Sequence, residues 1–338
     1  MPKNTLKKKK KKNKRSTTPG VSGASHGVVK SVSKTKRAAV IANAGSQPAH
    51  SAPAPARRPS DAVINRNFLA KAYREYYNSA GRRRPQHVVK RMYSFMGEGP
   101  PGYLNTPIGN RDFQSLLDGE RQGDYKVEAQ SASDNWRGLR AGDYFHLINE
   151  AHPLPSAQKA QTLGNRARRL IVNVKNQAAA LKAVRGLVPL FKDGNVGPFF
   201  RSFKVFLSSR ADTQKSVKYD KLVVYYALKD PNAADDDVGK QLVSAIETAV
   251  PEGERDSKFA PFYSFVTPGV AWSEEPKYFV QKLDNSFTET RANVIDDVIK
   301  NNDAVPNEAA FATLVDNAFQ RERIDPAKPH RHVVAKTP

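Results

Sequence analysis

Basic side chains interrupt three apolar, strand-like runs of the sequence. They are Arg168 and Arg169 in RRLIVNV, Arg201 and Lys204 in PFFRSFKVFL, and Lys218 and Lys221, which flank Asp220 before LVVYYAL. Because side chains alternate between the two faces of a strand, one face of a sheet built from three such strands gathers cations from each. That face could bind an anion. The alternative interpretation is that lysines on an edge strand keep the sheet from aggregating.

The run PFFRSFKVFL separates its two cations. Strand alternation places Phe200, Ser202, Lys204 and Phe206 on one face and Phe199, Arg201, Phe203 and Val205 on the other. Lys204 and Arg201 therefore cannot serve one site, and we interpret Arg201 as a solvated or edge charge.

Common catalytic and cofactor signatures are missing from the sequence. It contains no GxxxxGK[ST], HExxH or HRD motif, and no cysteine. The letters of GxSxG and GxGxxG occur at 23–27 and 97–102, but the first lies in the basic N-terminal stretch and the second in a loop rich in turn residues, not between a strand and a helix. His146, in GDYFHLI, is the only histidine in a predicted ordered element, and it is either a structural residue or an acid. His330 and His332 flank an arginine near the C-terminus, a spacing that does not predict a metal site. We expect no cofactor and no metal.

Apolar periodicity predicts alternating strands and helices. Strands are predicted over 125–129, 143–148, 168–174, 198–207 and 221–228 and within 262–276, and helices over 61–77, 177–191, 236–250, 286–301 and 307–323, with a short one near 113–117. Asp61 is placed to cap the first helix. Residues 168–207 have β-α-β form, so we expect their two strands to share a sheet. The predicted fold class is α+β, with a mixed sheet flanked by helices.

The N-terminal sixty residues differ in composition from the rest. Residues 1–60 hold fifteen of the 55 Lys and Arg residues and none of the 33 Asp and Glu residues, so most of the net charge of +22 belongs to them. Such a segment cannot bury enough apolar surface to order itself, and we predict a disordered basic arm. It could be a solubilising tail, a nuclear or nucleolar address, a nucleic-acid-binding arm or part of a secretion leader.

We divide the chain into four parts on these patterns. They are the arm 1–60, a helical N-terminal region 61–119, an α+β domain 120–325 and a flexible tail 326–338. The apolar runs are too short to span a bilayer, so no membrane span is expected.

Five short motifs in the C-terminal half occur in a recognisable order. They are RLIVN at 169–173, FRSFKV at 200–205, KYDKLVVYY at 218–226, TPGVAWSEEP at 267–276 and SFTETR at 286–291. Together they resemble the HopA (HopPsyA-like) family of type III secretion effectors over about residues 120–305. Relatives of that family occur as lyase components of ribosomal-peptide pathways. The family fold resembles that of the phosphothreonine lyase effectors.

This resemblance implies a site that eliminates phosphate from phosphoserine or phosphothreonine. Lys204 stands where the lyases carry their base. Lys218 replaces an arginine that usually precedes an acid in the family pattern. Asp220 matches that acid and Tyr225 matches the tyrosine of the pattern, and both are expected to be supporting residues. Arg291 and Arg169 correspond to cations that would hold the phosphate.

The sequence also departs from the lyase pattern. Ile171 occupies the position of the histidine that acts as the acid in the lyases. Lys218 cannot make the bidentate hydrogen bonds to phosphate that an arginine makes. Either Asn173 or His146 supplies the missing donor, or the chain keeps the fold as a non-catalytic binder.

The resemblance also predicts partners and a location. The expected partner is a phosphorylated protein or peptide, such as a host signalling protein. The expected location is a host cell after secretion, or the cytoplasm, with a nuclear or nucleolar site through the basic arm. The competing function is a viral capsid or other nucleic-acid-binding protein, which would use that arm and a jelly-roll body.

Overall fold

The structure, a computed structural model, describes only part of the chain. The described residues are 58–85, 91–129, 143–152, 167–214, 216–230, 232, 235–276 and 286–333. The chain divides into two units, Met1–Ala56 and Arg57–Pro338, and all described residues belong to the second. The basic arm predicted over 1–60 therefore lies outside the described residues, apart from its last three.

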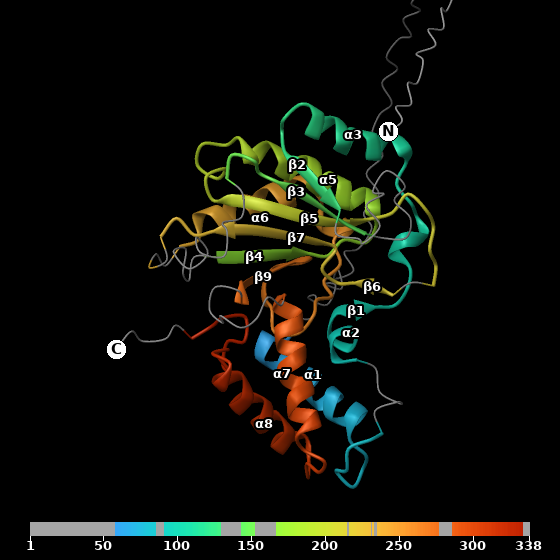
Figure 1. Ribbon diagram of the computed structural model, residues 1–338, viewed down its shortest axis with the longest axis vertical. Helices are drawn as coiled ribbons and strands as arrows, with labels where there is room; N and C mark the ends of the chain where they lie inside the picture. The colour runs from blue at the N-terminus through green and yellow to red at the C-terminus, as the bar shows by residue number, and fades with distance from the viewer. Residues whose placement is uncertain are drawn as a thin grey trace, which may run out of the picture. The chain divides into compact units, whose positions relative to one another are not determined.

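A seven-stranded sheet forms the centre of this unit (Figure 1). In spatial order its strands are β2 (Lys126–Ala129), β3 (Asp143–Ile148), β5 (Phe200–Leu207), β7 (Leu222–Ala227), β4 (Ala167–Val172), β9 (Val270–Glu274) and β8 (Ser264–Thr267). Its ladders are all antiparallel. The α+β class is confirmed. The two strands of the β-α-β segment share the sheet, as expected, but β7 lies between them. The sheet was expected to be mixed, whereas every ladder among the described residues is antiparallel.

Two helices cover one face of the sheet, which carries Leu170, Phe203 and Val224 and is called here the α5 face. They are α5 (Gln177–Leu187), capped by Asn176, and α6 (Asp237–Ala249), capped by Asp236. α5 is followed directly by a 3₁₀ turn, Val188–Phe191. The two helices lie so close that a Cβ added to Gly186 would be 2.8 Å from the Ala249 side chain. Figure 1 shows both behind the sheet.

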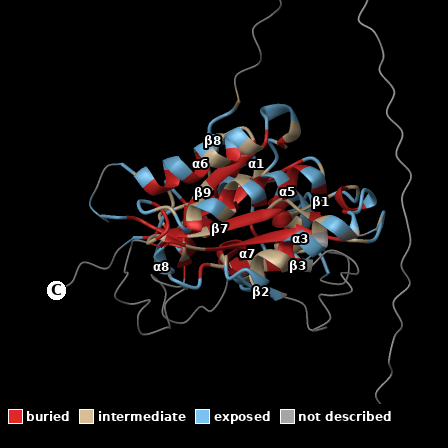
Figure 2. Ribbon diagram, turned by 90° about the horizontal axis from the view of Figure 1, so that it is seen from above, coloured by how far each residue is buried: buried red, intermediate tan, exposed pale blue. Residues whose placement is uncertain are grey.

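Four helices pack against part of the opposite face, which carries Lys204, Val223 and Ile171 and is called here the lysine face. They are α1 (Asp61–Tyr76), α2 (Met92–Gly97), α7 (Phe287–Lys300) and α8 (Glu308–Arg321). Ser60 rather than Asp61 caps α1; Asp61 instead accepts a hydrogen bond from the Phe265 backbone. In Figure 1 α1, α7 and α8 gather beyond β9. Figure 2 shows the strands buried between helices with exposed outer sides.

The remaining elements are short or lie at the margins. α3 (Asn110–Arg121) lies near β2, β1 (Glu98–Gly99) pairs with β6 (Val217–Lys218), and 3₁₀ turns span Tyr103–Asn105 and Glu252–Glu254.

A β-bulge at Arg201 changes the predicted alternation of β5. The register passes from Phe200 opposite Tyr226 to Ser202 opposite Tyr225, which leaves Arg201 as the extra residue. Phe200 was predicted to share a face with Lys204, but this was wrong. Its ring packs 4.4 Å from that of Phe191 on the α5 face.

Candidate functional site

Lys204 and His146 face each other across two neighbouring strands. His146 of β3 pairs with Lys204 of β5, and Lys204 pairs in turn with Val223 of β7. Directly opposed residues on antiparallel strands have their Cβ atoms about 5 Å apart. The sheet therefore brings together two of the residues proposed from the sequence, and His146 is the nearer of the two candidate donors.

Lys204 is buried among aromatic and charged groups. It is 8% exposed, and its Nζ lies 4.2 Å from the centre of the Tyr144 ring. Burial lowers the pKa of Lys204 to about 8; Asp220 opposes the shift, while Arg169 and Lys218 add to it. A lysine with this pKa is partly uncharged near neutral pH, as a general base must be.

His146 is kept uncharged by the same surroundings. Burial, and then the nearby charge of Lys204, lower the pKa of His146 to about 4. At neutral pH its imidazole therefore carries one N–H donor and one acceptor nitrogen.

Tyr144 connects Lys204 to Asp220 and Lys218. The Tyr144 hydroxyl donates to the Asp220 carboxylate and to its backbone carbonyl, both at 2.9 Å. Lys218 Nζ lies 5.4 Å from the centre of the same ring and donates to the Tyr93 hydroxyl at 3.3 Å. Burial opposes the charge of Lys218, but Tyr93 and Asp220 outweigh it and raise its pKa. Lys218 therefore stays a cation beside the candidate base.

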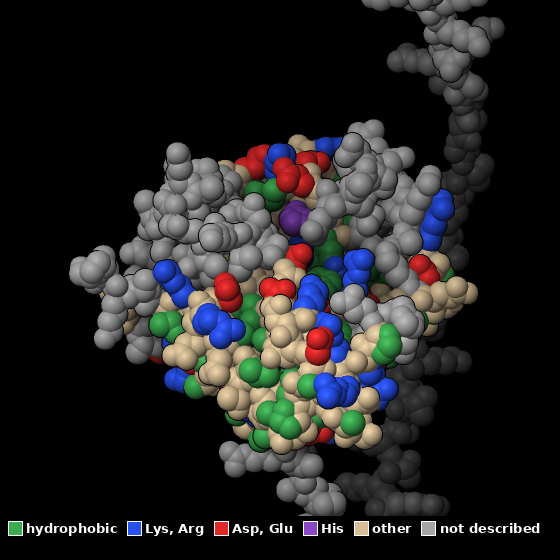
Figure 3. Space-filling view, turned by 60° about the horizontal axis from the view of Figure 1, so that its bottom comes forward, with side chains coloured by type: hydrophobic (Ala, Val, Ile, Leu, Met, Phe, Trp, Pro, Cys, Tyr) green, Lys and Arg blue, Asp and Glu red, His purple; other side chains and the backbone are tan. Residues whose placement is uncertain are grey.

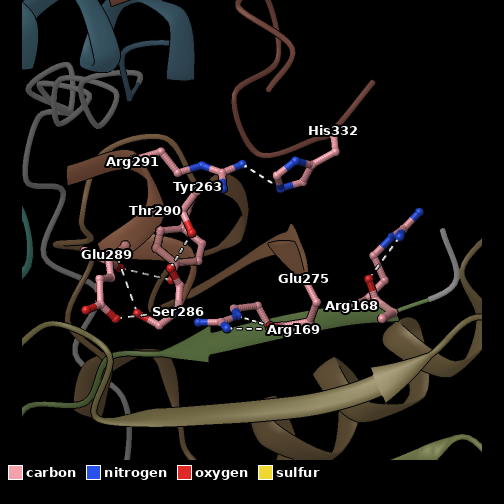
Figure 4. Close-up of polar contacts among 11 residues, drawn as sticks. Arg168, Arg169, Tyr263, Glu275, Ser286, Glu289, Thr290, Arg291 and His332 are labelled. Carbon is pink, nitrogen blue, oxygen red and sulfur yellow. Dashed lines mark hydrogen bonds and ion pairs between the residues drawn. The ribbon is translucent and has the colours of Figure 1, made fainter. Parts of the chain in front are cut away.

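Arg169 lies one residue pair further along the lysine face. It pairs with Tyr225 on one side and Ser273 on the other, and its guanidinium lies over the Tyr225 ring. Both oxygens of Glu275 accept hydrogen bonds from it, one of them at 2.7 Å (Figure 4). The charge of Arg169 is thus already neutralised by a carboxylate, and a phosphate would have to compete with Glu275.

Arg291 makes its hydrogen bonds to the C-terminal segment of the chain. This residue of α7 is fully buried and donates through Nε and Nη2 to the Pro329 carbonyl. Nη2 also lies 3.2 Å from Nε2 of His332 (Figure 4). Burial lowers the pKa of Arg291 to about 9. Arg291 therefore ties down part of the segment expected to be a flexible tail.

Asn173 also lies apart from Lys204. Its side-chain amide donates to the Lys258 carbonyl at 2.6 Å and accepts from Lys221. Ile171 is fully buried between Val223 and Ala271. Of the sequence-based candidates, the described contacts gather Lys204, His146, Lys218 and Asp220, with Arg169 and Tyr225 beside them, and direct Asn173 and Arg291 to other partners.

Two hydroxyls on the lysine face lack a hydrogen-bond partner among the described residues. They belong to Ser202, which pairs with Tyr225, and Ser273, which pairs with Arg169. Buried hydroxyls without partners are uncommon in folded proteins, and these two lie beside Tyr225 and Arg169 of the candidate site. Figure 3 shows basic and acidic side chains lying close together on one face of the molecule.

Sequence reasoning found Tyr225 but missed two other aromatic members of this site, Tyr144 and Tyr93. Tyr144 could have been found, because it precedes His146 by two residues and strand alternation puts both on one face. Tyr93 could not, since its contact with Lys218 depends on the pairing of β1 with β6.

The sequence profile of the HopA1 effector protein family matches residues 142–331, more than half of the chain. The chain belongs to the HopA1 effector family. That family comprises type III effectors, so membership supports a role in virulence after secretion into a host cell. A search of curated proteins finds no match.

Two solved structures share the fold of this chain. They are effector proteins from Pseudomonas syringae pv. tomato strain DC3000 and pv. syringae strain 61, each with a TM-score of 0.54 and 14% sequence identity. The matches cover 80% and 81% of this chain and 97% and 98% of those chains. At this identity the likeness concerns the fold alone.

Two further findings limit the chemistry within the described residues. No described helix is both long and apolar enough to cross a membrane. The described side chains also contain no cluster of three or more histidine, aspartate or glutamate residues suited to a metal ion.

Proposed function

We propose that this HopA1-family effector acts on phosphoserine or phosphothreonine in proteins of the host cell and removes the phosphate by elimination. The observation that carries the proposal is the cross-strand pair of Lys204, which is buried, and His146, which is half-buried, both with lowered pKa values. A buried amine with a pKa near 8 has few structural uses, whereas perturbed groups of this kind gather at functional sites.

Elimination makes a simple demand on Lys204. Its uncharged amine takes the proton from Cα of the phosphorylated residue, and the electrons of that bond form a double bond between Cα and Cβ. The bond from Cβ to oxygen then breaks, and phosphate leaves with the electron pair of this Cβ–O bond. The products are a dehydroamino acid residue and inorganic phosphate, so neither water nor a redox partner is consumed.

The neighbouring groups support the departing phosphate. Lys218 stays protonated and lies near Lys204, so its charge favours a dianion there. The imidazole of His146 offers an N–H to the leaving oxygen, and a bound dianion would raise its pKa and strengthen that donor. His146 thus takes the role of the histidine that Ile171 replaces.

The experiment that tests this function is a mass measurement of reacted peptides. The protein is incubated with phosphothreonine and phosphoserine peptides, and we expect the loss of phosphoric acid from the peptide. Hydrolysis would restore the hydroxyl and give a different mass. Lys204→Ala should abolish the loss, whereas Arg201→Ala, on the bulge of the same strand, should retain it.

Two results would contradict the lyase proposal. One is an unchanged mass across a wide peptide panel; the other is full activity in Lys204→Ala. Peptide binding that depends on Lys204 without any change in mass would instead assign the site to recognition of phosphorylated partners.

The basic arm carries a second candidate function, binding to nucleic acid or delivery to the nucleus. It rests on the fifteen basic and no acidic residues of 1–60. RNA retention that falls with salt and disappears when residues 1–57 are deleted would support it. The capsid version fits less well, because the described body is built on a seven-stranded sheet with helices on both faces rather than a jelly roll.

A further inference from the structure

A pocket lies on the opposite side of the sheet from Lys204. It has a volume of about 420 Å³ and is bounded by α6 and by the α5 face of β4, β7 and β9. Its apolar wall includes Leu170, Tyr226, Val243, Val266 and Trp272. Pockets of this size and character hold small organic ligands. Since the sheet separates it from Lys204, the proposed elimination chemistry gives it no role.

One side of the pocket is basic around a tryptophan. The guanidinium of Arg168 lies 5.6 Å from the centre of the Trp272 ring, and that of Arg331 lies 5.2 Å from it. Arg168 is buried and pairs with the buried carboxylate of Glu274 at 3.1 Å. Arg331 is exposed and has no ion pair with any described residue. Arg331 therefore contributes a positive charge that is not held in an ion pair with a described carboxylate, although Glu274 lies near enough to feel it.

The acidic groups of the pocket are already occupied. Asp236 accepts hydrogen bonds from the Tyr226 hydroxyl and from the Gly239 backbone. Glu247 accepts one from the Thr267 hydroxyl and pairs with Arg255. Arg255 balances the charge of Glu247, and both oxygens of Asp236 already accept hydrogen bonds.

Lys240 adds little to the positive charge of the pocket. It lines the same space, but its amine pairs with Asp235 at 3.0 Å. A nucleoside triphosphate would need several free cations, and the described lining offers one in Arg331. A single free guanidinium beside an apolar, aromatic wall fits a monoanion with a ring.

We propose that this pocket is a second ligand site and that it binds a small aromatic carboxylate. The ring would lie against Leu170, Val243 and Val266, and the carboxylate would face Arg331. The guanidinium of Arg331 can bond both oxygens of a carboxylate, which gives the site its preference for this group. The site would work independently of Lys204.

Calorimetric titration of the full chain with 2-naphthoate tests this proposal, with 2-naphthylmethylamine as the ring-matched cation. For a ligand of this size we expect a Kd on the order of 0.1 mM for the carboxylate and no measurable binding of the amine. Arg331→Gln should weaken naphthoate binding about tenfold. Val266→Asp should abolish it, because a carboxylate would then stand in the pocket wall.

Matched controls separate this site from the rest of the molecule. Val63→Asp changes another exposed valine, on α1, to the same charge and should leave the Kd unchanged. Lys204→Ala should also leave it unchanged, so the test is independent of the elimination reaction. Retained circular dichroism would show that Val266→Asp is folded.

Three outcomes would overturn the proposal. They are the absence of saturable heat with naphthoate, equal binding of acid and amine, and an unchanged Kd in both Arg331→Gln and Val266→Asp. Self-association of the chain that is lost in Val266→Asp would instead assign the pocket to a second copy of the protein.

Discussion

Adjacent residues of one strand lie on opposite faces of the central sheet and differ in role. Phe203 of β5 lies on the α5 face, where its ring packs against those of Phe191 and Phe200. Lys204, the next residue, lies on the lysine face beside His146 and Tyr144. Burial on the first face stabilises the fold through apolar contact, whereas burial on the second shifts pKa values at some cost in stability. The proposed function accounts for this difference, because a lysine face that binds a ligand needs such groups.

The largest expected effect is the loss of elimination in Lys204→Arg. Arginine keeps the positive charge and stays protonated at any accessible pH, so it cannot act as the base. We expect elimination to fall at least 100-fold, the lower end of what general base catalysis contributes. Arg201→Lys is the matched exchange on the same strand and should retain activity. Phosphopeptide turnover followed by mass measures both, and a fully active Lys204→Arg would show that Lys204 only carries charge.

Stability should respond in the opposite order to changes at these two residues. Phe203→Ala should lower the free energy of unfolding by about 3 to 5 kcal/mol, because it leaves a cavity in the apolar cluster. Lys204→Met should leave that free energy within about 1 kcal/mol or raise it, since it removes a buried charge. Urea unfolding at pH 7 measures both. An equal loss in the two variants would mean that the two faces do not differ as described.

The contacts of Arg291 predict a smaller effect, confined to the C-terminal segment. Arg291→Ala leaves the Pro329 carbonyl without its donor, and we expect a loss of about 2 to 3 kcal/mol in the free energy of unfolding. Trypsin should then cut faster after Arg331. Cleavage at the wild-type rate would show that other contacts hold the segment.

The pH dependence of elimination tests the pKa of Lys204 directly. With a pKa of about 8, roughly one-tenth of the amine is uncharged at pH 7. The value of kcat/KM at low substrate should therefore rise about tenfold between pH 7 and pH 9 and then level off. A profile that is flat over this range would exclude Lys204 as the base.

The smallest expected effect is a change in acid stability. His146 has a pKa of about 4 when folded and about 6.5 when unfolded. Between these values the unfolded chain binds a proton that the folded chain does not, so stability falls as the pH falls. His146→Gln should make this fall shallower by at most about 1.4 kcal/mol per pH unit. Urea unfolding from pH 7 to pH 4 measures the slope of the free energy of unfolding against pH. An unchanged slope in His146→Gln would mean that another group is responsible for the fall in stability.

The sequence was sufficient for the longer elements and for the faces of most strand residues, but not for α2, β1 and β6 or for the face of Phe200. Apolar periodicity predicted β3 with its observed bounds, and alternation separated Phe203 from Lys204. These features depend on neighbours in the chain.

Features that depend on distant pairings escaped prediction. Opposition of His146 and Lys204 requires the spatial order of the strands, which no local pattern encodes. The bulge at Arg201 moves Phe200 to the other face, and the contact of Arg291 with Pro329 joins residues 38 positions apart. Asn173 was expected near the base, but two polar partners from other segments hold it elsewhere.

The bond from Arg291 to Pro329 also bears on when the protein can finish folding. Every strand of the sheet is synthesised before Pro329, so a growing chain can assemble the sheet while the guanidinium of Arg291 still lacks its acceptor. A buried cation without an acceptor opposes closure of the α7 layer around it. Closure of that layer therefore waits until Pro329 has been synthesised and has reached Arg291.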